Sequence, residues 1–239
     1  MINKLWIMKL KILLIMGLIG GLYACSEKKG YFPPNEIPTL TSECEMLSEK
    51  EIERISNSET PPDSDIFVRD TLPDGTIKGY CTLFPKAEIL RTYDRLAQYP
   101  YFIIYKDFDR LTGKLLSKEI EAPGSITIGM SFHFYETGRV KEIKQEEKGY
   151  KINVNQLLKL LSDRGIFIPK TDDNYVHPDT TCIGILGGIY RIKINGNLCY
   201  SVFYHLPKDI GSVYGKTLEI DGADGTILGE KDESYNSCE

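Results

Sequence analysis

Alternating apolar and polar positions dominate the middle of the chain, and a period of two predicts β-strands. Residues 66–68 and 77–83 flank Pro73-Asp74-Gly75, where the Asp-Gly pair supplies the positive φ that a tight hairpin turn needs. The later alternating runs are 101–105, 114–120, 126–135 and 139–145. Because glycine-containing turns separate these runs, the pattern predicts an antiparallel meander.

Three segments show helical spacing instead. Ser48 and Glu51 have the form of a capping box, and we expect a short helix that ends before Pro61. Residues 87–97 carry apolar side chains on one helical face and are predicted to be helical, closed by Pro100. A third helix is predicted from Asn153 as N-cap to Gly165, and its buried stripe is Val154, Leu157, Leu158 and Leu161.

Two hairpins are predicted near the C-terminus. Residues 190–194 and 198–205 flank Asn195-Gly196, which fits a two-residue type I′ turn, and residues 217–221 and 226–228 flank Asp224-Gly225. Hairpin-linked strands with segregated helices predict an α+β fold. We expect an antiparallel sheet meander with few helices, followed by a C-terminal helix plus antiparallel sheet module.

The start of the chain has the features of a secretory signal. Lys4, Lys9 and Lys11 precede an apolar segment from Ile12 to Tyr23. Its 12 residues are fewer than the ~20 needed to span a bilayer. We interpret residues 1–24 as a cleaved signal peptide. An uncleaved anchor over residues 5–24 and a secreted form without lipid are the open alternatives.

Leu22-Tyr23-Ala24-Cys25 resembles a bacterial lipobox, although Tyr23 departs from the small residue usual at that place. This resemblance implies lipidation of Cys25 by a diacylglycerol and further acyl chains such as palmitate. Two or three acyl chains hold a protein on a membrane without a protein span. The expected location is the bacterial cell envelope, at an outer membrane facing the periplasm or the cell surface.

Composition divides the remaining chain. Residues 25–41 are polar and contain three prolines, which favours a flexible lipidated tether. The folded part is then expected as a meander-rich α+β module over residues 42–150 and a second module over 151–239. Loss of the signal removes three lysines and no acid, so the formal charge changes from −5 to −8. An acidic chain without clustered Lys and Arg is not suited to bind nucleic acid.

Five cysteines remain besides Cys25. At most two intramolecular disulfides can therefore form, and at least one cysteine remains outside them. Our candidate disulfide joins Cys182 and Cys238, which lie near the two ends of the C-terminal module. The alternative is that several cysteines are small buried side chains. No C-x-x-C pair is present, so neither a redox motif nor a zinc site is indicated.

Residues 108–115 echo residues 134–140, with Gly113 and Gly138 at matching turn positions. Together, about residues 108–145 resemble a MORN-type or tyrosine-aspartate-type hairpin repeat. A generic meander also favours these residues, and that alternative stays open.

The order of a helix, hairpins and the final Leu218 to Gly229 stretch resembles a PepSY module over about residues 153–230. This resemblance implies an extracytoplasmic, non-catalytic module of a kind proposed to restrain peptidases.

Signatures of catalysis are absent from the sequence. It contains no G-x-S-x-G, H-E-x-x-H, P-loop or G-x-G-x-x-G motif. His133 lies within an alternating strand and His205 ends one. We expect both side chains to be packed or solvent-exposed and not to be catalytic. The loop containing Asp172, Asp173, His177 and Asp179 lacks fixed ligand spacing, so we expect no metal and no cofactor.

We therefore expect a non-catalytic binding or structural protein, held on the membrane by its N-terminal lipid and contacting a protein partner in the envelope through tyrosine-rich strands. Two alternatives remain. An immunity or inhibitor protein would present its acidic surface to a toxin or peptidase, and a small hydrolase would need a histidine bonded to a nucleophile in a cleft.

Overall fold

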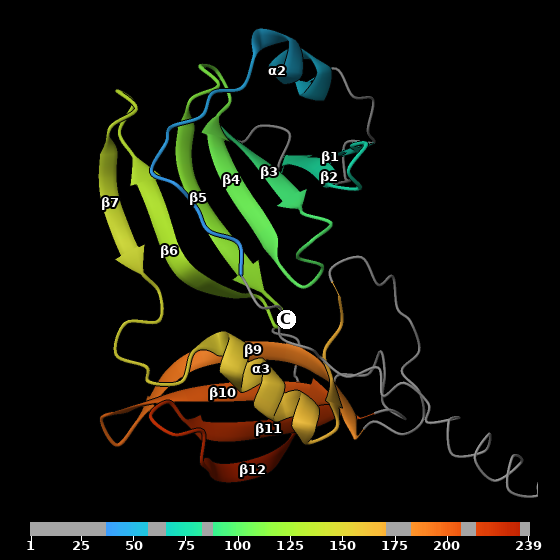
Figure 1. Cartoon of the computed structure of the whole chain (residues 1–239), viewed down its shortest axis with the longest axis vertical. Coiled ribbons are helices and arrows are strands. Elements are labelled where there is room, and N and C mark those ends of the chain that lie inside the picture. The colour runs from blue at the N-terminus through green and yellow to red at the C-terminus, as the bar shows by residue number, and fades with distance from the viewer. Residues whose placement is uncertain (1–36, 57–65, 83–87, 171–182, 207–213, 235–239) are drawn as a thin grey trace, which may run out of the picture. The chain divides into compact units, whose positions relative to one another are not determined.

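Strands make up most of the structure. The computed structural model describes residues 37–56, 66–82, 88–170, 183–206 and 214–234, drawn in colour in Figure 1. Of these residues 53% lie in strands and 11% in helices. The α+β prediction is therefore wrong, because the described chain is mostly β, with two sheets and only two short helices.

The first sheet is an antiparallel meander of seven strands in sequence order. Its members are β1 (Ile66–Thr71), β2 (Ile77–Thr82), β3 (Ile89–Arg95), β4 (Ile103–Asp109), β5 (Leu115–Ala122), β6 (Ile126–Phe134) and β7 (Val140–Gln145). The predicted Asp74-Gly75 hairpin between β1 and β2 is confirmed, with Gly75 at φ 83°. The two echoing segments are the β4–β5 and β6–β7 hairpins, whose turn glycines Gly113 and Gly138 also have positive φ.

The helix predicted over residues 87–97 is wrong, because this segment contains strand β3. Its apolar spacing fits a helix, but Ile89, Thr92 and Tyr93 are β-branched or aromatic and favour a pleated surface. Tyr93 lies directly opposite Gly79 of β2. A Cβ at Gly79 would approach the Tyr93 ring to 1.9 Å, so the ring occupies the space that the glycine leaves open. That packing depends on a neighbouring strand and not on local spacing.

The capping box at Ser48 is confirmed, and it begins α2 (Glu49–Ser56). The Ser48 backbone N–H donates to Glu51 Oε2 at 2.9 Å, and the Glu51 N–H donates to Ser48 Oγ at 3.2 Å. Leu47 before the cap and Ile52 within the helix both belong to the core beneath α2, as in a hydrophobic staple. These contacts fix the angle at which the preceding segment enters the helix.

The second sheet has the order β12-β11-β10-β9-β8. Its strands are β8 (Ile166–Phe167), β9 (Gly184–Ile194), β10 (Asn197–His205), β11 (Tyr214–Asp221) and β12 (Ile227–Ser234). All pairs are antiparallel except β8 with β9. The predicted Asn195-Gly196 turn is confirmed, since both residues have positive φ, at 51° and 86°.

The predicted helix after Asn153 is also confirmed as α3 (Val154–Asp163), and Asn153 and Gln156 form its capping box. The predicted stripe is buried: Val154, Leu157, Leu158 and Leu161 are all 0% exposed. These side chains belong to a core that also contains residues of both sheets, among them Ile120 and Val202. A second core, which includes Leu90, Phe108 and Phe132, lies beside α2 on the first sheet.

Candidate functional site

The register of the first sheet places a polar row on one of its faces. Thr92 of β3 pairs with Lys106 of β4, and Lys106 pairs with Lys118 of β5. Directly opposite residues of an antiparallel pair point to the same face. The row continues with buried Phe132 of β6, which lies opposite Lys118. Two lysines therefore lie side by side on a face that is otherwise largely apolar.

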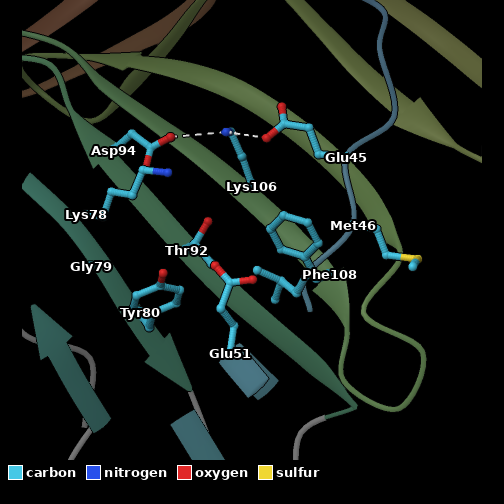
Figure 2. A pocket seen from close by; sticks show the side chains of 11 residues that line it. Glu45, Met46, Glu51, Lys78, Gly79, Tyr80, Thr92, Asp94, Lys106 and Phe108 are labelled. Atoms are coloured by element: carbon cyan, nitrogen blue, oxygen red, sulfur yellow. Dashed lines mark hydrogen bonds and ion pairs between the residues drawn. The ribbon is translucent and has the colours of Figure 1, made fainter. Parts of the chain in front are cut away.

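Neighbouring lysines repel one another, and an acidic side chain between them offsets this repulsion. Lys118 is only 2% exposed, and its Nζ lies 3.4 Å from Glu45 Oε1. The other carboxylate oxygen of Glu45 lies 2.6 Å from Lys106 Nζ, and Asp94 Oδ2 lies 3.1 Å from the same nitrogen. Figure 2 shows the Asp94–Lys106–Glu45 chain of contacts. Two acids and two lysines thus form a charge cluster whose formal charges cancel.

Glu45 is delivered by residues 43–47, which we call the strap. The Leu47 N–H donates to the Gly113 carbonyl at 2.9 Å, and the Leu115 N–H donates to the Glu45 carbonyl at 3.3 Å. Lys118 Nζ also donates to the Glu43 carbonyl at 2.6 Å. Gly113 has φ 67°, and a Cβ there would lie 2.7 Å from the Leu47 carbonyl oxygen. The β4–β5 turn therefore needs glycine both for its own conformation and to receive the strap.

A polar hollow lies beside the strap and α2, with a volume of about 160 Å³. Its lining includes Lys106, Asp94 and Glu45 of the charge cluster together with Glu51, Lys78 and Tyr80. In Figure 2 the Tyr80 hydroxyl and the Glu51 carboxylate point toward the same space as Thr92. With roughly 30 Å³ per water molecule, the hollow has room for a few waters or one small polar group of a partner.

The surroundings of this site move the pKa values of Glu45, Lys106 and Tyr80 away from neutrality. Burial alone raises the pKa of Glu45, but the hydrogen bonds and charges of Lys106 and Lys118 outweigh burial and lower it. Burial likewise opposes the charge of Lys106, but Asp94 and Glu45 raise its pKa overall. Burial and the Glu51 carboxylate raise the pKa of Tyr80. Proton transfer near neutral pH needs a group whose pKa lies close to 7, and these shifts all lead away from it.

The opposite face of the first sheet carries a second polar row, in which Arg91, Asp107, Ser117 and His133 lie on successive strands. Arg91 donates twice to Asp107, at 2.7 and 2.9 Å, which raises the pKa of the guanidinium. Ser117 Oγ donates to Asp107 Oδ2 at 3.2 Å. The serine proton is therefore directed to Asp107, so this row lacks the serine-to-histidine hydrogen bond of a hydrolase.

The residues singled out by sequence fall mostly outside the described residues. Cys25, the Cys182–Cys238 pair and the Asp172–His177–Asp179 loop all lie there. Among described cysteines, Cys44 is an exposed free thiol and Cys199 a buried one. His205 packs edge-on against Phe203, with ring centroids 4.8 Å apart. Neither His133 nor His205 lines the polar hollow.

Sequence analysis did not find Glu45, Lys106 or Lys118. One signal was available: Lys118 shares its strand face with Ile120 and Ala122, so alternation alone places a charge where an apolar side chain is expected. Its partner Glu45 lies on a segment whose path across the sheet no local pattern indicates.

None of the helices in the described residues combines the length and the apolar character that crossing a bilayer requires.

Comparisons with known proteins identify no family. No family model matches the chain. A search of curated proteins also finds no match. Among solved structures, the chain is similar to the Bacillus megaterium YpeB C-terminal domain, with 11% identity over 78% of this chain and 98% of that one. The TM-score of that match is 0.17, which is too low to support an argument about fold or function.

Proposed function

We propose that this chain is an exported, lipid-anchored protein of the bacterial cell envelope that binds a protein partner and has no catalytic activity of its own. The proposed anchor is Cys25, at the end of Leu22-Tyr23-Ala24-Cys25. The mature chain would then begin at Cys25, with the folded sheets held outside the cytosol.

One observation carries the non-catalytic part of the proposal: the two lysines and two acids of the charge cluster neutralise one another. Lys106 lies between Glu45 and Asp94, and Glu45 also faces Lys118. A catalytic acid or base is usually tuned toward neutral pH by its surroundings, whereas the pKa of Glu45 is lowered and that of Lys106 is raised. This arrangement favours a stable binding surface over proton transfer.

The proposal assigns the partner contact to the polar hollow. Lys78 lines it, is exposed, and forms no ion pair with the other described residues. A charged group that is solvated in the free protein and converges with a tyrosine hydroxyl and a carboxylate is suited to bind a complementary polar side chain of a partner.

The anchor is tested by intact-mass measurement of the chain recovered from membranes. We expect a chain that begins at Cys25 and carries the added mass of acyl groups, and we expect Cys25→Ser to lose that mass and to leave the membrane fraction. A chain that retains Met1, or an unmodified Cys25 in a diffusing product, contradicts the anchor.

Partner binding is tested by cross-linked pull-down from membranes with the wild type, Lys78→Glu and Lys148→Glu. Lys148 is exposed in the turn that follows β7 and does not line the hollow, so it provides a matched charge-reversal control. We expect Lys78→Glu to lose the partner and Lys148→Glu to retain it. Equal recovery with all three proteins contradicts the assignment to the hollow.

An immunity or inhibitor role is the second candidate, and the acidity of the exported part favours it, since loss of the signal changes the formal charge from −5 to −8. Complementary charge accelerates the association of such proteins with basic targets. A single basic toxin or peptidase in the pull-down supports this candidate, whereas several envelope proteins support a scaffold.

A further inference from the structure

One of the two edges of the first sheet is formed by β7, which among the described strands pairs with β6 alone and lies at the border of that sheet in Figure 1. An unpaired strand edge is a template for another strand. The central side chain of β7, Ile143, is 54% exposed. It lies opposite buried Phe132 and therefore extends the apolar core of that face to the edge.

The sequence of β7 is complementary to itself in one antiparallel register. When Ile143 lies opposite Ile143 of a second copy, Glu142 of each chain lies opposite Lys144 of the other. Opposite charges on directly facing residues stabilise a strand pair. Neither Glu142 nor Lys144 forms an ion pair within the described residues of its own chain, so both charges are available.

Neighbouring registers lack this match. A slip of one residue in one direction places Lys141 opposite Lys144, and a slip of one in the other direction places Ile143 opposite Lys144. Slips of two residues place Glu142 opposite Glu142, or Lys144 opposite Lys144. Lysines on an edge strand prevent unselective pairing, and here they leave one symmetric register without a charge conflict.

At β12, which forms one edge of the second sheet, charged side chains already form ion pairs within the chain. On β12, Glu230 binds Lys216 at 2.6 Å, and Lys231 contacts Glu219 of the neighbouring strand. In contrast to β12, β7 has charged side chains that are available to a partner strand.

We propose that two copies of this chain associate through β7, antiparallel and centred on Ile143, so that the first sheet continues across a two-fold axis. Closed two-fold symmetry uses one surface on both subunits and limits assembly to a dimer. Main-chain hydrogen bonds between the edges provide affinity, and the Glu142–Lys144 pairs select the register.

Disulfide trapping in membranes from cells that make the full chain tests this proposal. In Ile143→Cys the new thiols of two copies face one another within disulfide reach, and we expect a covalent dimer on mild oxidation well above the background from the native cysteines of the wild type. Lys141→Cys is the matched control, because residues 141 of the two copies would lie about 14 Å apart along the strands. Trapping no greater than the wild-type background, or equal trapping at positions 141 and 143, overturns the proposal.

Charge reversal tests the register in the same Ile143→Cys chain. We expect Glu142→Lys to reduce the trapped fraction about tenfold, because both symmetric pairs change from attraction to repulsion. Adding Lys144→Glu to that variant exchanges the two charges and restores trapping. All three sites are exposed, so circular dichroism should show the same fold throughout. Equal trapping with Glu142→Lys and with the charge-exchanged chain contradicts the proposed register.

Discussion

Lys118 is the residue on which the polar site depends. Its side chain is 2% exposed, and its ammonium group is held by the Glu43 carbonyl at 2.6 Å and by Glu45. A buried charge that loses its partner destabilises a fold, whereas an apolar side chain of similar length is often tolerated in its place. The buried charge of Lys118 is therefore compensated by the strap. In the described structure, Glu45 is the only acidic side chain of the strap that contacts Lys106 or Lys118.

The first prediction concerns the removal of that acid. Because the Glu45 side chain is 44% exposed, solvent screens its ion pairs, and we expect Glu45→Gln to lower the free energy of unfolding by about 1–2 kcal/mol. Chemical denaturation measures this change. Glu43→Gln is the control, since only the main-chain carbonyl of Glu43 contacts Lys118. Adding Lys118→Met to Glu45→Gln should recover much of the loss, and a further loss of similar size would contradict this account.

The pH dependence gives a second prediction for the same carboxylate. The pKa of Glu45 is lowered in the folded protein, so its contribution is fully present above the ordinary glutamate pKa of about 4.3 and is lost as the pH falls through the folded value. The difference in unfolding free energy between wild type and Glu45→Gln should therefore be constant from pH 7 to about pH 5 and shrink below about pH 4. An undiminished difference at pH 3 would show that Glu45 acts through packing instead of charge.

At the scale of elements, the capping box of α3 tests how much a contact between residues close in sequence contributes to stability. The Asn153 side chain accepts from the Gln156 N–H at 2.8 Å, and the Gln156 side chain accepts from the Asn153 N–H at 2.9 Å. We expect Asn153→Ala to lower the unfolding free energy by about 1 kcal/mol. Lys159→Ala removes only an exposed pair with Asp163 and should change it by less than about 0.5 kcal/mol. Equal effects of the two substitutions in thermal unfolding would argue against the cap.

The β2–β3 pair tests a packing contact between residues of two different strands. Tyr93 covers Gly79, where a Cβ would meet the ring at 1.9 Å, whereas a Cβ at Gly229 in β12 meets no atom closer than 3.5 Å. We expect Gly79→Ala to displace the ring and lower the unfolding free energy by about 1–3 kcal/mol. Gly229→Ala, also within a strand, should have little effect. Similar melting temperatures for the two variants would contradict the packing described here.

The contrast between α3 and strand β3 shows which parts of the fold can be predicted from sequence. The capping boxes at Ser48 and Asn153 and the Asn195-Gly196 turn depend on residues within four positions of each other, and all were predicted correctly. Strand β3 was not, because Tyr93 is positioned by Gly79 of another strand. The charge cluster was missed for the same reason, since Glu45 and Lys118 are distant in sequence and only the strap brings them together.

At the scale of the whole molecule, the larger core joins side chains that sequence analysis had assigned to separate modules. Phe102 and Ile128 of the region before residue 150 share this core with Leu158 of α3 and Leu218 of β11. If residues 42–150 and 151–239 were independent modules, a cavity in α3 would leave the first sheet unaffected. A shared core instead couples their unfolding, since loss of packing on one side exposes the apolar surface of the other.

The last prediction separates these two cases. Leu158 is fully buried, and we expect Leu158→Ala to lower the unfolding free energy by about 2–5 kcal/mol. Hydrogen exchange followed by mass spectrometry should then show faster exchange by a similar factor in β4–β6 and in β9–β11, because both sheets lose protection through one global opening. Lys159→Ala, next to it but exposed, serves as the control. Exchange that accelerates in β9–β11 while β4–β6 keep their wild-type protection would show that the two sheets unfold independently despite their common core.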